Sequence, residues 1–348
     1  MLLVNNNSPY AFYNSFKGGG KSLTFQLSAI TDEGTTIVVM PLISLIQDQM
    51  NFLADLGIHS VFFKGNMEKT QEFYNNLVNP ESEADRIKLV FVTPEKLTRA
   101  TSFQDILTEL HSNGKLARFV IDEAHCVSQW GNDFRPDYLQ LRMLKHTFPD
   151  VPLLALTATA TELVKEEMVK NLQMKHALFF QSSFNRPNLF YEVRSKTKIH
   201  SLIEDIGTFI QRNYPNSPGI IYCNSKKTCE ELSKLLCRNY HVKCSFYHAG
   251  LEVSKRSNVQ QQWMEEQVKV VCATIAFGLG INKKNVRFVI HHSMAKSLEE
   301  YIQETGRAGR DGKLSHCVMY VFIKGNFVCF LMGFLGIMIL MIRGRSSI

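Results

Sequence analysis

Short runs of β-branched and aliphatic residues alternate with longer amphipathic stretches along most of the chain. The apolar runs lie at 36–40, 88–92, 119–121 and 153–156, and then at 219–222, 268–272 and 286–290. Runs of this length predict buried strands, whereas the periodicity of 42–56 and 161–172 predicts helices. Strands joined by helical crossovers form parallel sheets with helices on both faces. The pattern therefore predicts an α/β protein in which this scheme occurs twice.

The chain length also favours two domains. It has 348 residues, and single hydrophobic cores stop growing at about 250–300 residues. The polar segment Ser183–Asn188 contains a proline and is a plausible joint, so we expect domains over 1–185 and 186–326. The remainder, 327–348, begins with the apolar run 327–342, whereas a membrane-spanning helix needs about 20 apolar residues. This run is compatible with a membrane anchor, a buried helix or a segment foreign to the working fold.

A glycine-rich segment near the start predicts a phosphate-binding loop. Gly18, Gly19 and Gly20 precede Lys21 and Ser22, and a helical pattern follows. Glycines allow backbone N–H groups to approach phosphate oxygens, a lysine reaches the β- and γ-phosphates, and a hydroxyl ligates Mg²⁺. The strict pattern has glycine where this chain has Ser15, so an ordinary glycine turn is the alternative.

Two further segments contain residue types that are suited to phosphoryl transfer. Asp122 and Glu123 follow the apolar run 119–121, where one carboxylate suits a hydrated Mg²⁺ and the other suits an attacking water. Arg307 and Arg310 are three residues apart, which places them on one face of an expected helix. Guanidinium groups stabilise charge on a transferring phosphoryl group. Taken alone, the first segment would usually be a solvated turn, and the second would more often be a charged surface helix.

Together, and in this order, the segments resemble the motifs of superfamily-2 helicases, specifically those of the RecQ family of DNA helicases. The resemblance runs from Gly18 to about Phe322. It rests on segments 18–22, 40–49, 92–97, 122–125, 156–161, 219–223, 273–281 and 303–310, and on an aromatic-rich loop at 128–138 that is typical of RecQ proteins.

The resemblance implies two tandem RecA-like domains that bind ATP and Mg²⁺ between them and move along DNA in the 3′ to 5′ direction. It implies catalytic roles for Lys21, Asp122, Glu123, Arg307 and Arg310, with Arg310 resembling an arginine finger. The ATP-binding residues would be Gly18, Gly19, Gly20, Lys21, Ser22, Gln303, Arg307 and Arg310. Ser22 and Asp122 would hold Mg²⁺, and His125, Thr157 and Thr159 would couple nucleotide state to DNA binding.

The implied DNA contacts come from two kinds of residue. Aromatic rings can stack on bases and an arginine can pair with phosphate, which gives roles to Trp130, Phe134, Tyr138 and Arg135. Polar side chains at Ser44, Thr93 and Thr274 would contact the backbone, independently of sequence. The net charge is −4 over residues 1–185 and +11 over 186–348, and a basic half fits a polyanion partner. We therefore expect a chromosomal location, in the nucleus of a eukaryotic cell.

Several positions depart from the family pattern. Ser15, Phe16 and Lys17 replace the usual residues before the glycines, and Asn132 and Asn282 replace a histidine and an aspartate. The chain reaches the phosphate loop so early that we expect neither the adenine-recognition motif nor the first strand. Only Cys317 and Cys329 lie where a four-cysteine zinc subdomain should follow, so no zinc site is expected. The alternatives are an inactive ATP- and DNA-binding remnant, an RNA helicase and a membrane-attached protein.

Overall fold

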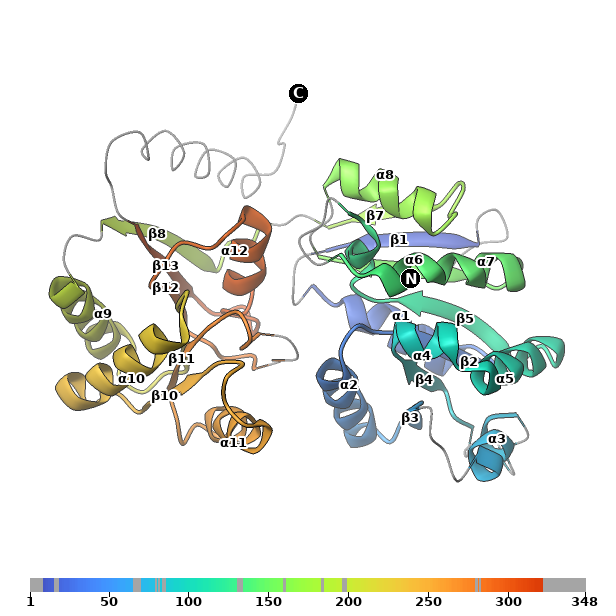
Figure 1. The fold of residues 1–348 in the computed structure, drawn as a ribbon, viewed down its shortest axis with the longest axis horizontal. Coiled ribbons are helices and arrows are strands. Elements are labelled where there is room, and N and C mark those ends of the chain that lie inside the picture. Colours follow the sequence, from blue (N-terminus) through green and yellow to red (C-terminus); the bar gives the residue numbers. More distant parts are fainter. Residues whose placement is uncertain are drawn as a thin grey trace. The chain divides into compact units, whose positions relative to one another are not determined.

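The computed structural model describes two compact units. They comprise Met1–Ser182 and Ser183–Ile348, and Figure 1 shows the elements of each. The described residues are 9–15, 19–64, 70–78, 80, 82, 86–129, 134–158, 161–182, 185–195, 199–278, 281 and 283–321.

The first unit is built on a seven-stranded parallel sheet with strand order β3-β4-β2-β5-β6-β1-β7. Its strands are β1 Tyr10–Asn14, β2 Thr35–Val39, β3 Ser60–Phe62, β4 Leu89–Val92, β5 Leu116–Ile121, β6 Leu153–Thr157 and β7 Leu178–Gln181. The central strands β2 and β4 are buried on both faces, which explains their uninterrupted apolar sequences.

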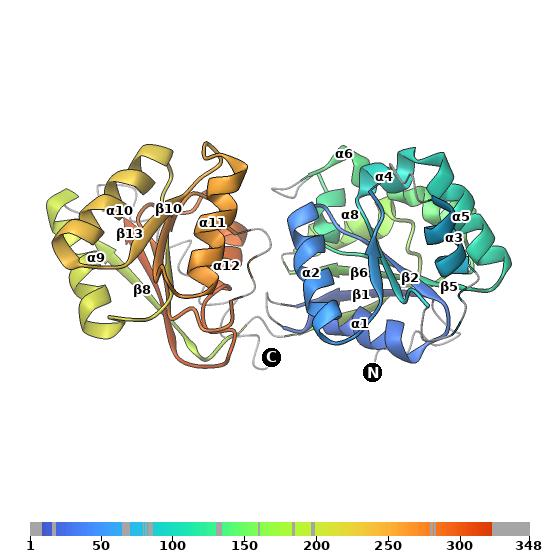
Figure 2. The same cartoon turned by 90° about the horizontal axis from the view of Figure 1, so that it is seen from below.

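Helices cover both faces of this sheet. On one face, α1 (Lys21–Thr31) and α2 (Ile43–Asp55) pack Phe25 and Ile46 against alternate strand residues such as Val38. The other face is covered by α3 Thr70–Val78, α4 Pro94–Arg99, α5 Thr101–Ser112, α6 Pro136–Leu139, α7 Met143–Thr147 and α8 Glu162–Asn171, with the 3₁₀ turns η2 Ala124–Val127 and η3 Gln140–Arg142. Figure 2 shows the sheet between these layers.

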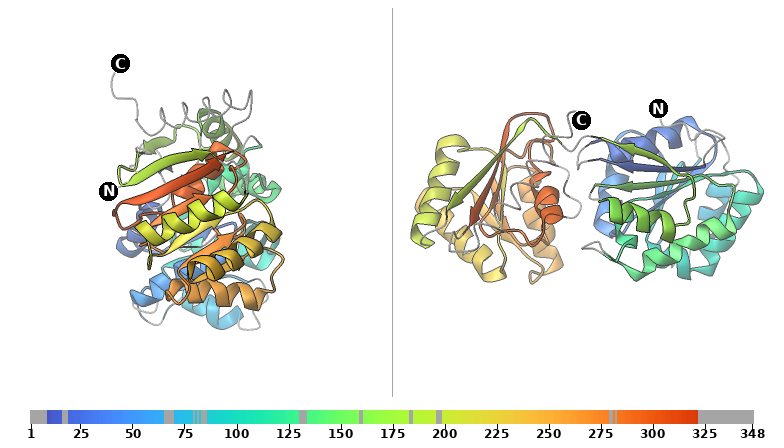
Figure 3. Two further views of the ribbon diagram at one scale, coloured as in Figure 1. Left: turned by 90° about the vertical axis from the view of Figure 1, so that its left-hand side faces the viewer. Right: turned by 90° about the horizontal axis from the view of Figure 1, so that it is seen from above.

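The strand that precedes the phosphate loop is present, so the expectation that the chain begins too late to supply it is wrong. β1 lies between β6 and β7, with Tyr10 opposite Leu153 and Ala11 opposite Leu178 (Figure 3). It has only five residues, and its aromatic sequence lacks the aliphatic run by which the other inner strands are recognised. A strand of this length needs little chain, which explains how it fits before the glycines.

The second unit contains a six-stranded parallel sheet with order β10-β11-β9-β12-β13-β8. Its strands are β8 Leu189–Ser195, β9 Gly219–Tyr222, β10 Cys244–Tyr247, β11 Val270–Ala273, β12 Phe288–His291 and β13 Ser315–Val321. Helices α9 Ile199–Asn213 and α10 Lys226–Tyr240 cover one face, and α11 Val253–Met264 and α12 Leu298–Thr305 cover the other (Figure 2). The prediction of two parallel, helix-flanked sheets is thereby confirmed.

The apolar run 327–342 lies outside the described residues. Within the part of the chain that the structure describes, no helix is long and apolar enough to cross a membrane.

Candidate active site

The carboxyl ends of the inner strands of the first sheet meet at one edge. The Ser15 amide donates to the Thr157 carbonyl over 3.2 Å, and the Asp122 amide donates to the Val39 carbonyl over 2.9 Å. These bonds join the segments that leave β1, β6, β5 and β2. In open parallel sheets, ligands bind at this edge, where neighbouring strands are followed by loops that run apart.

The glycine-rich loop opens directly into α1. Gly20 has φ 80° and ψ 17°, a left-handed conformation that favours glycine, and no side chain caps the helix. The uncapped N–H groups and the helix dipole make this end attractive to an anion. The Lys21 ammonium donates to the Ser15 carbonyl over 3.1 Å, so it folds back over the loop, and Ser22 is half-buried in the first turn. Gly18 lies outside the described residues.

Tyr13 supports the same loop, a role that the sequence pattern did not suggest. Its hydroxyl donates to the Gly19 carbonyl over 3.3 Å and lies 3.0 Å from the Ser182 hydroxyl, which follows β7. The end of the first unit is thus tied to the phosphate loop. A tyrosine one residue before a strand end gives no sequence signal of this contact, because Ser182 is 169 positions away.

Asp122 and Glu123 form a strained acidic turn at the end of β5. Glu123 has φ 48° and ψ 43°, which is unfavourable for a residue with a side chain, and its amide donates to the Asp122 carboxylate over 3.0 Å. Burial and, to a smaller extent, the Glu123 charge raise the pKa of Asp122 to about 6, whereas the Lys21 charge lowers it. The acidic turn therefore lies within electrostatic reach of the phosphate-loop lysine, so one site contains both.

His125 links the acidic turn to the end of β6. Its Nδ1 atom lies 3.0 Å from the Thr157 hydroxyl oxygen and 3.4 Å from a carboxylate oxygen of Glu123. His125 and Thr157 are both buried, so this contact is shielded from water. Thr159, the other expected coupling residue, lies outside the described residues.

The aromatic-rich loop is attached to the site at its C-terminal end. The Tyr138 hydroxyl donates to the Asp122 carbonyl over 3.0 Å, and the Arg135 guanidinium donates to the Pro41 carbonyl over 2.8 Å. Tyr138 is fully buried, so the expectation that its ring stacks on a base is not supported: the ring belongs to the core. Phe134 is half-buried, and Trp130 lies outside the described residues.

The other expected DNA contacts differ in accessibility. Ser44 is exposed in the first turn of α2, next to the Pro41 segment that Arg135 contacts. Thr93 precedes α4 and is 9% exposed, which leaves little of it to meet a ligand. In the second unit, Thr274 is half-buried after β11, and its amide donates to the Tyr247 carbonyl over 3.2 Å.

Arg307 and Arg310 lie in the turns after α12, not on a helix as expected. The helix ends at Thr305, and Gly306 forms its C-terminal cap. The Arg307 guanidinium donates to the Gly278 carbonyl, and that of Arg310 donates to the Ile281 carbonyl over 2.9 Å.

Both arginines are therefore held by the loop that follows β11. Burial, together with the positive charges of Arg307 and Arg186, lowers the pKa of Arg310 to about 9, so Arg310 remains charged at neutral pH. Gln303, which precedes these arginines on α12, is half-buried.

The donor set of the first unit fits a hard divalent cation. Asp122 supplies a half-buried carboxylate, Ser22 a hydroxyl and Glu123 a second carboxylate, and Mg²⁺ prefers such oxygen ligands. Among the residues that the structure describes, no group of three or more His, Cys, Asp or Glu side chains is arranged to hold a metal ion. In proteins Mg²⁺ usually keeps several waters and binds one or two carboxylates together with substrate phosphates.

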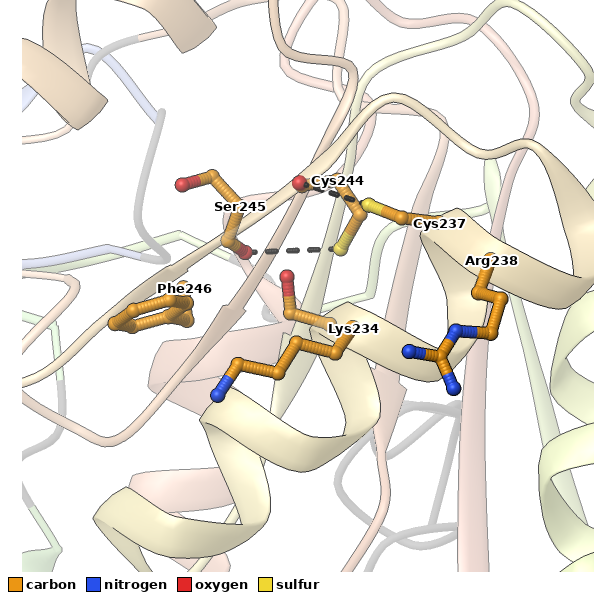
Figure 4. A pocket seen from close by; sticks show the side chains of 7 residues that line it. Lys234, Cys237, Arg238, Cys244, Ser245 and Phe246 are labelled. Atoms are coloured by element: carbon orange, nitrogen blue, oxygen red, sulfur yellow. Dashed lines mark hydrogen bonds between the residues drawn. The ribbon is translucent and has the colours of Figure 1, made fainter.

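A pocket of about 480 Å³ lies elsewhere, in the second unit, and lacks the features of a nucleotide site. Ser233, Lys234, Cys237 and Arg238 of α10 and Cys244, Ser245 and Phe246 of β10 line it (Figure 4). The Cys237 thiol donates to the Cys244 carbonyl over 3.2 Å, and burial is the main cause that raises its pKa. A thiol held protonated is a poor nucleophile, so we assign this pocket no catalysis.

Comparison with known proteins agrees with this architecture. Residues 11–166 match the family described as DEAD/DEAH box helicase, and residues 197–312 match the helicase conserved C-terminal domain. The chain is 50% identical over 303 residues to ATP-dependent DNA helicase Q-like 4B of Arabidopsis thaliana, covering 87% of this chain and 26% of that protein. It is 46% identical over 309 residues to ATP-dependent helicase SGS1 of Saccharomyces cerevisiae, covering 87% and 21%. The chain thus spans about a quarter of the first relative and about a fifth of the second.

Solved structures share the fold at lower identity. A structure of the helicase MrfA bound to DNA and AMPPNP aligns with TM-score 0.74 and 16% identity, covering 94% of this chain and 48% of that one. Dbp5 of Saccharomyces cerevisiae, bound to RNA and ADP BeF3, aligns with TM-score 0.67 and 21% identity, covering 96% and 85%. These likenesses show that the two units have the fold of tandem RecA-like domains. The chain is therefore a helicase core of the DEAD/DEAH-box type and belongs to the RecQ family.

Proposed function

We propose that this chain is the catalytic core of an ATP-dependent 3′–5′ DNA helicase, which hydrolyses ATP in order to move along single-stranded DNA and separate duplex strands. The observation that carries the proposal is the attachment of the aromatic-rich loop to the acidic turn. Tyr138 bonds the backbone of Asp122, and Arg135 of the same loop bonds the backbone of Pro41. One short segment thus contacts both the expected ATP side and the expected DNA side of the first unit.

The ATP chemistry follows from the acidic turn and the phosphate loop. Lys21 and the N-terminus of α1 bind the phosphates, with Gly19 and Gly20 allowing their close approach. A bound Mg²⁺, held by Ser22 and through water by Asp122, would neutralise phosphate charge. Glu123 orients and deprotonates the attacking water. Its left-handed backbone conformation is the kind of strain that persists where the surrounding structure fixes a functional side chain.

The arginines of the second unit supply the remaining charge stabilisation. Arg307 and Arg310 present delocalised positive charge, which suits the spread negative charge of a transferring phosphoryl group. Gln303 would assist in binding the nucleotide. We assign these roles by likeness to the sixth motif of the RecQ family.

Coupling to DNA runs through two contacts of the first unit, one buried and one partly buried. His125 bonds Thr157, and Tyr138 bonds the Asp122 backbone, so a shift of either partner displaces the acidic turn. Phe134, Trp130 and Arg135 would contact single-stranded DNA by stacking and ion pairing, and Ser44, Thr93 and Thr274 its phosphates. Tyr138 anchors the loop and does not stack. A DNA substrate would place the protein in the nucleus of a eukaryotic cell.

A strand-displacement assay tests this proposal. The full chain is expected to unwind a DNA duplex with a 3′ single-stranded tail when ATP and Mg²⁺ are present, and to leave a 5′-tailed duplex intact. A non-hydrolysable ATP analogue and the variant Glu123→Gln serve as controls for dependence on hydrolysis. Unwinding of duplex RNA in preference to DNA would favour an RNA helicase. ATP and DNA binding without unwinding or turnover would show an inactive remnant.

A further inference from the structure

Arg186 is buried in the segment that leads into β8, and its side chain forms hydrogen bonds with the backbone of the turns after α12. Its guanidinium donates to three backbone carbonyls: to Gly306 over 3.0 Å, to Ala308 over 2.8 Å and to Gly309 over 2.6 Å. Arg186 is only 8% exposed, so water competes little for these bonds. Three charge-assisted hydrogen bonds from one rigid fork fix both distance and orientation.

Asn188 holds the same turns at a second point. Its side-chain amide donates to the Gly309 carbonyl over 2.8 Å and to the Lys313 carbonyl over 3.0 Å. The backbone carbonyl of Asn188 accepts a hydrogen bond from the Ser315 amide over 2.9 Å. Gly309 has φ +54°, and a Cβ atom there would lie 2.5 Å from the Asn188 amide nitrogen. The positive φ and the close approach of Asn188 therefore both favour glycine at position 309.

The carbonyls that Arg186 binds are next in the chain to the two arginines assigned to ATP hydrolysis. Arg307 lies between the Gly306 and Ala308 carbonyls that Arg186 binds, and Arg310 directly follows Gly309. Arg186 is also close enough that its charge contributes to lowering the pKa of Arg310. Three cationic side chains therefore lie near one another in a mostly buried setting, and each of them donates to backbone carbonyls.

We propose that Arg186 is a positioning residue for Arg307 and Arg310, which sets their guanidinium groups through the backbone of residues 306–309. The inference rests on the proposed function in that it takes these two arginines to act in ATP hydrolysis. Since Arg186 lies just after the boundary of the first unit, movement of the segment before β8 would reach both arginines through this contact.

Steady-state ATP hydrolysis by the full chain tests the positioning role. Arg186→Ala is expected to lower kcat by roughly 10- to 100-fold, because a displacement of about 1 Å at a reacting group can have such an effect. The KM for ATP should change by less than about threefold, since the phosphate loop is untouched. Arg186→Lys should recover little of kcat, because one ammonium cannot reproduce three bonds of a planar fork. Added guanidinium ion should partly restore Arg186→Ala.

Arg194→Ala is the matched control. Arg194 lies on β8, in the same unit, and bonds the Glu192 and Asp205 carboxylates over 2.8 and 3.0 Å, away from the 306–313 turns. Its removal also deletes a bidentate guanidinium, and kcat should be retained. Asn188→Ala removes only the side-chain hydrogen bonds of Asn188 to Gly309 and Lys313, so it should lower kcat less than Arg186→Ala does. It also provides the test if Arg186→Ala does not fold.

Hydrogen exchange separates this inference from the proposed function. The amides of Gly309 and Asp311, which donate to the Val286 and Lys284 carbonyls, should exchange faster in Arg186→Ala than in wild type or Arg194→Ala. If the wild-type chain hydrolyses no ATP, the proposed function fails and this exchange result alone decides the inference. Unchanged exchange with kcat within about twofold of wild type, or an equal effect of Arg194→Ala, would overturn it.

Discussion

The Nδ1 atom of His125 and the hydroxyl oxygen of Thr157 lie 3.0 Å apart in the buried interior of the first unit. The pair joins the acidic turn after β5 to the end of β6. The same end of β6 accepts the Ser15 amide over 3.2 Å, and Ser15 in turn accepts the Lys21 ammonium. Hydrogen bonds thus connect Lys21, through Ser15 and Thr157, to the histidine beside Glu123.

Removal of the Thr157 hydroxyl should weaken coupling more than folding. Thr157→Val keeps the side-chain shape and leaves His125 without this partner, which costs about 1 kcal/mol of folding free energy. Basal ATP turnover should persist, while its stimulation by single-stranded DNA falls several-fold. Thr35→Val is the matched control, because Thr35 is also buried on a strand and donates to the Ile87 carbonyl over 2.8 Å. Equal loss of stimulation in both variants would show that the hydroxyl has only a structural role.

Glu123→Gln should separate binding from hydrolysis. The amide keeps the size of the side chain but cannot accept the proton of the attacking water, so turnover should fall by about 10²-fold or more while ATP affinity is retained. Lys21→Ala should instead lose affinity and turnover together, because it removes phosphate charge neutralisation in both states. Equilibrium binding of a fluorescent ATP analogue and steady-state turnover measure the two quantities. Full activity of either variant would contradict the site.

The pair His291–Glu304 should be essential for the stability of the second unit. Their side chains lie 2.7 Å apart and are 1% and 5% exposed, and they join β12 to α12. His291→Ala leaves a buried carboxylate without its partner, which should cost about 3–5 kcal/mol.

Urea unfolding followed by Trp263 fluorescence, in a Trp130→Phe background, measures this loss. Lys227→Ala removes an exposed pair with Glu231, 3.7 Å apart, and should cost less than about 0.5 kcal/mol. Similar losses for the buried and the exposed pair would contradict this account of α12.

The ionised Glu266 side chain should stabilise the second unit at neutral pH, and this stabilisation should be lost in acid. Hydrogen bonds from Lys269, and then from Asn285 and Lys283, lower the pKa of Glu266 to about 2 from its usual 4.5. A lowered folded-state pKa stabilises the fold above the unfolded value, and that stabilisation is lost as the pH falls through the folded value. Glu266→Gln should therefore destabilise by about 1 kcal/mol at pH 7, a modest figure because the carboxylate is partly exposed.

The difference between wild type and Glu266→Gln should shrink as the pH falls from 4.5 toward 2. Urea unfolding at pH 7, 5 and 3, followed by the same fluorescence probe, measures this difference in the free energy of unfolding. A difference that stays constant over this range would show that the carboxylate charge does not stabilise the fold.

The strands that sequence predicts are the ones buried on both faces, such as β2 and β9, because an unbroken aliphatic run has few other interpretations. β1 is rich in aromatic residues, and β7 is an exposed edge strand, so neither carries that signal. Lys21 and the acidic turn are predictable since each belongs to a local motif. The hydrogen bond from Arg186 to Gly306 joins residues that are 120 positions apart, so no local sequence pattern could predict it.

The Tyr138 result shows a second limit. An aromatic-rich loop indicates stacking, but the pattern cannot tell which ring enters the core, and here the structure buries Tyr138 completely. Likewise the spacing of Arg307 and Arg310 suggested a helix, whereas α12 ends at Thr305 and glycines turn the chain.

The most direct test of the account is the rate of ATP hydrolysis by the full chain with and without single-stranded DNA, compared for wild type and Phe134→Ala. We predict that single-stranded DNA raises wild-type kcat by about 10-fold or more, because closure around a ligand completes a catalytic site. Phe134→Ala should keep the basal rate and lose the stimulation. A wild-type rate that does not respond to DNA would contradict the central claim that this core couples ATP hydrolysis to DNA.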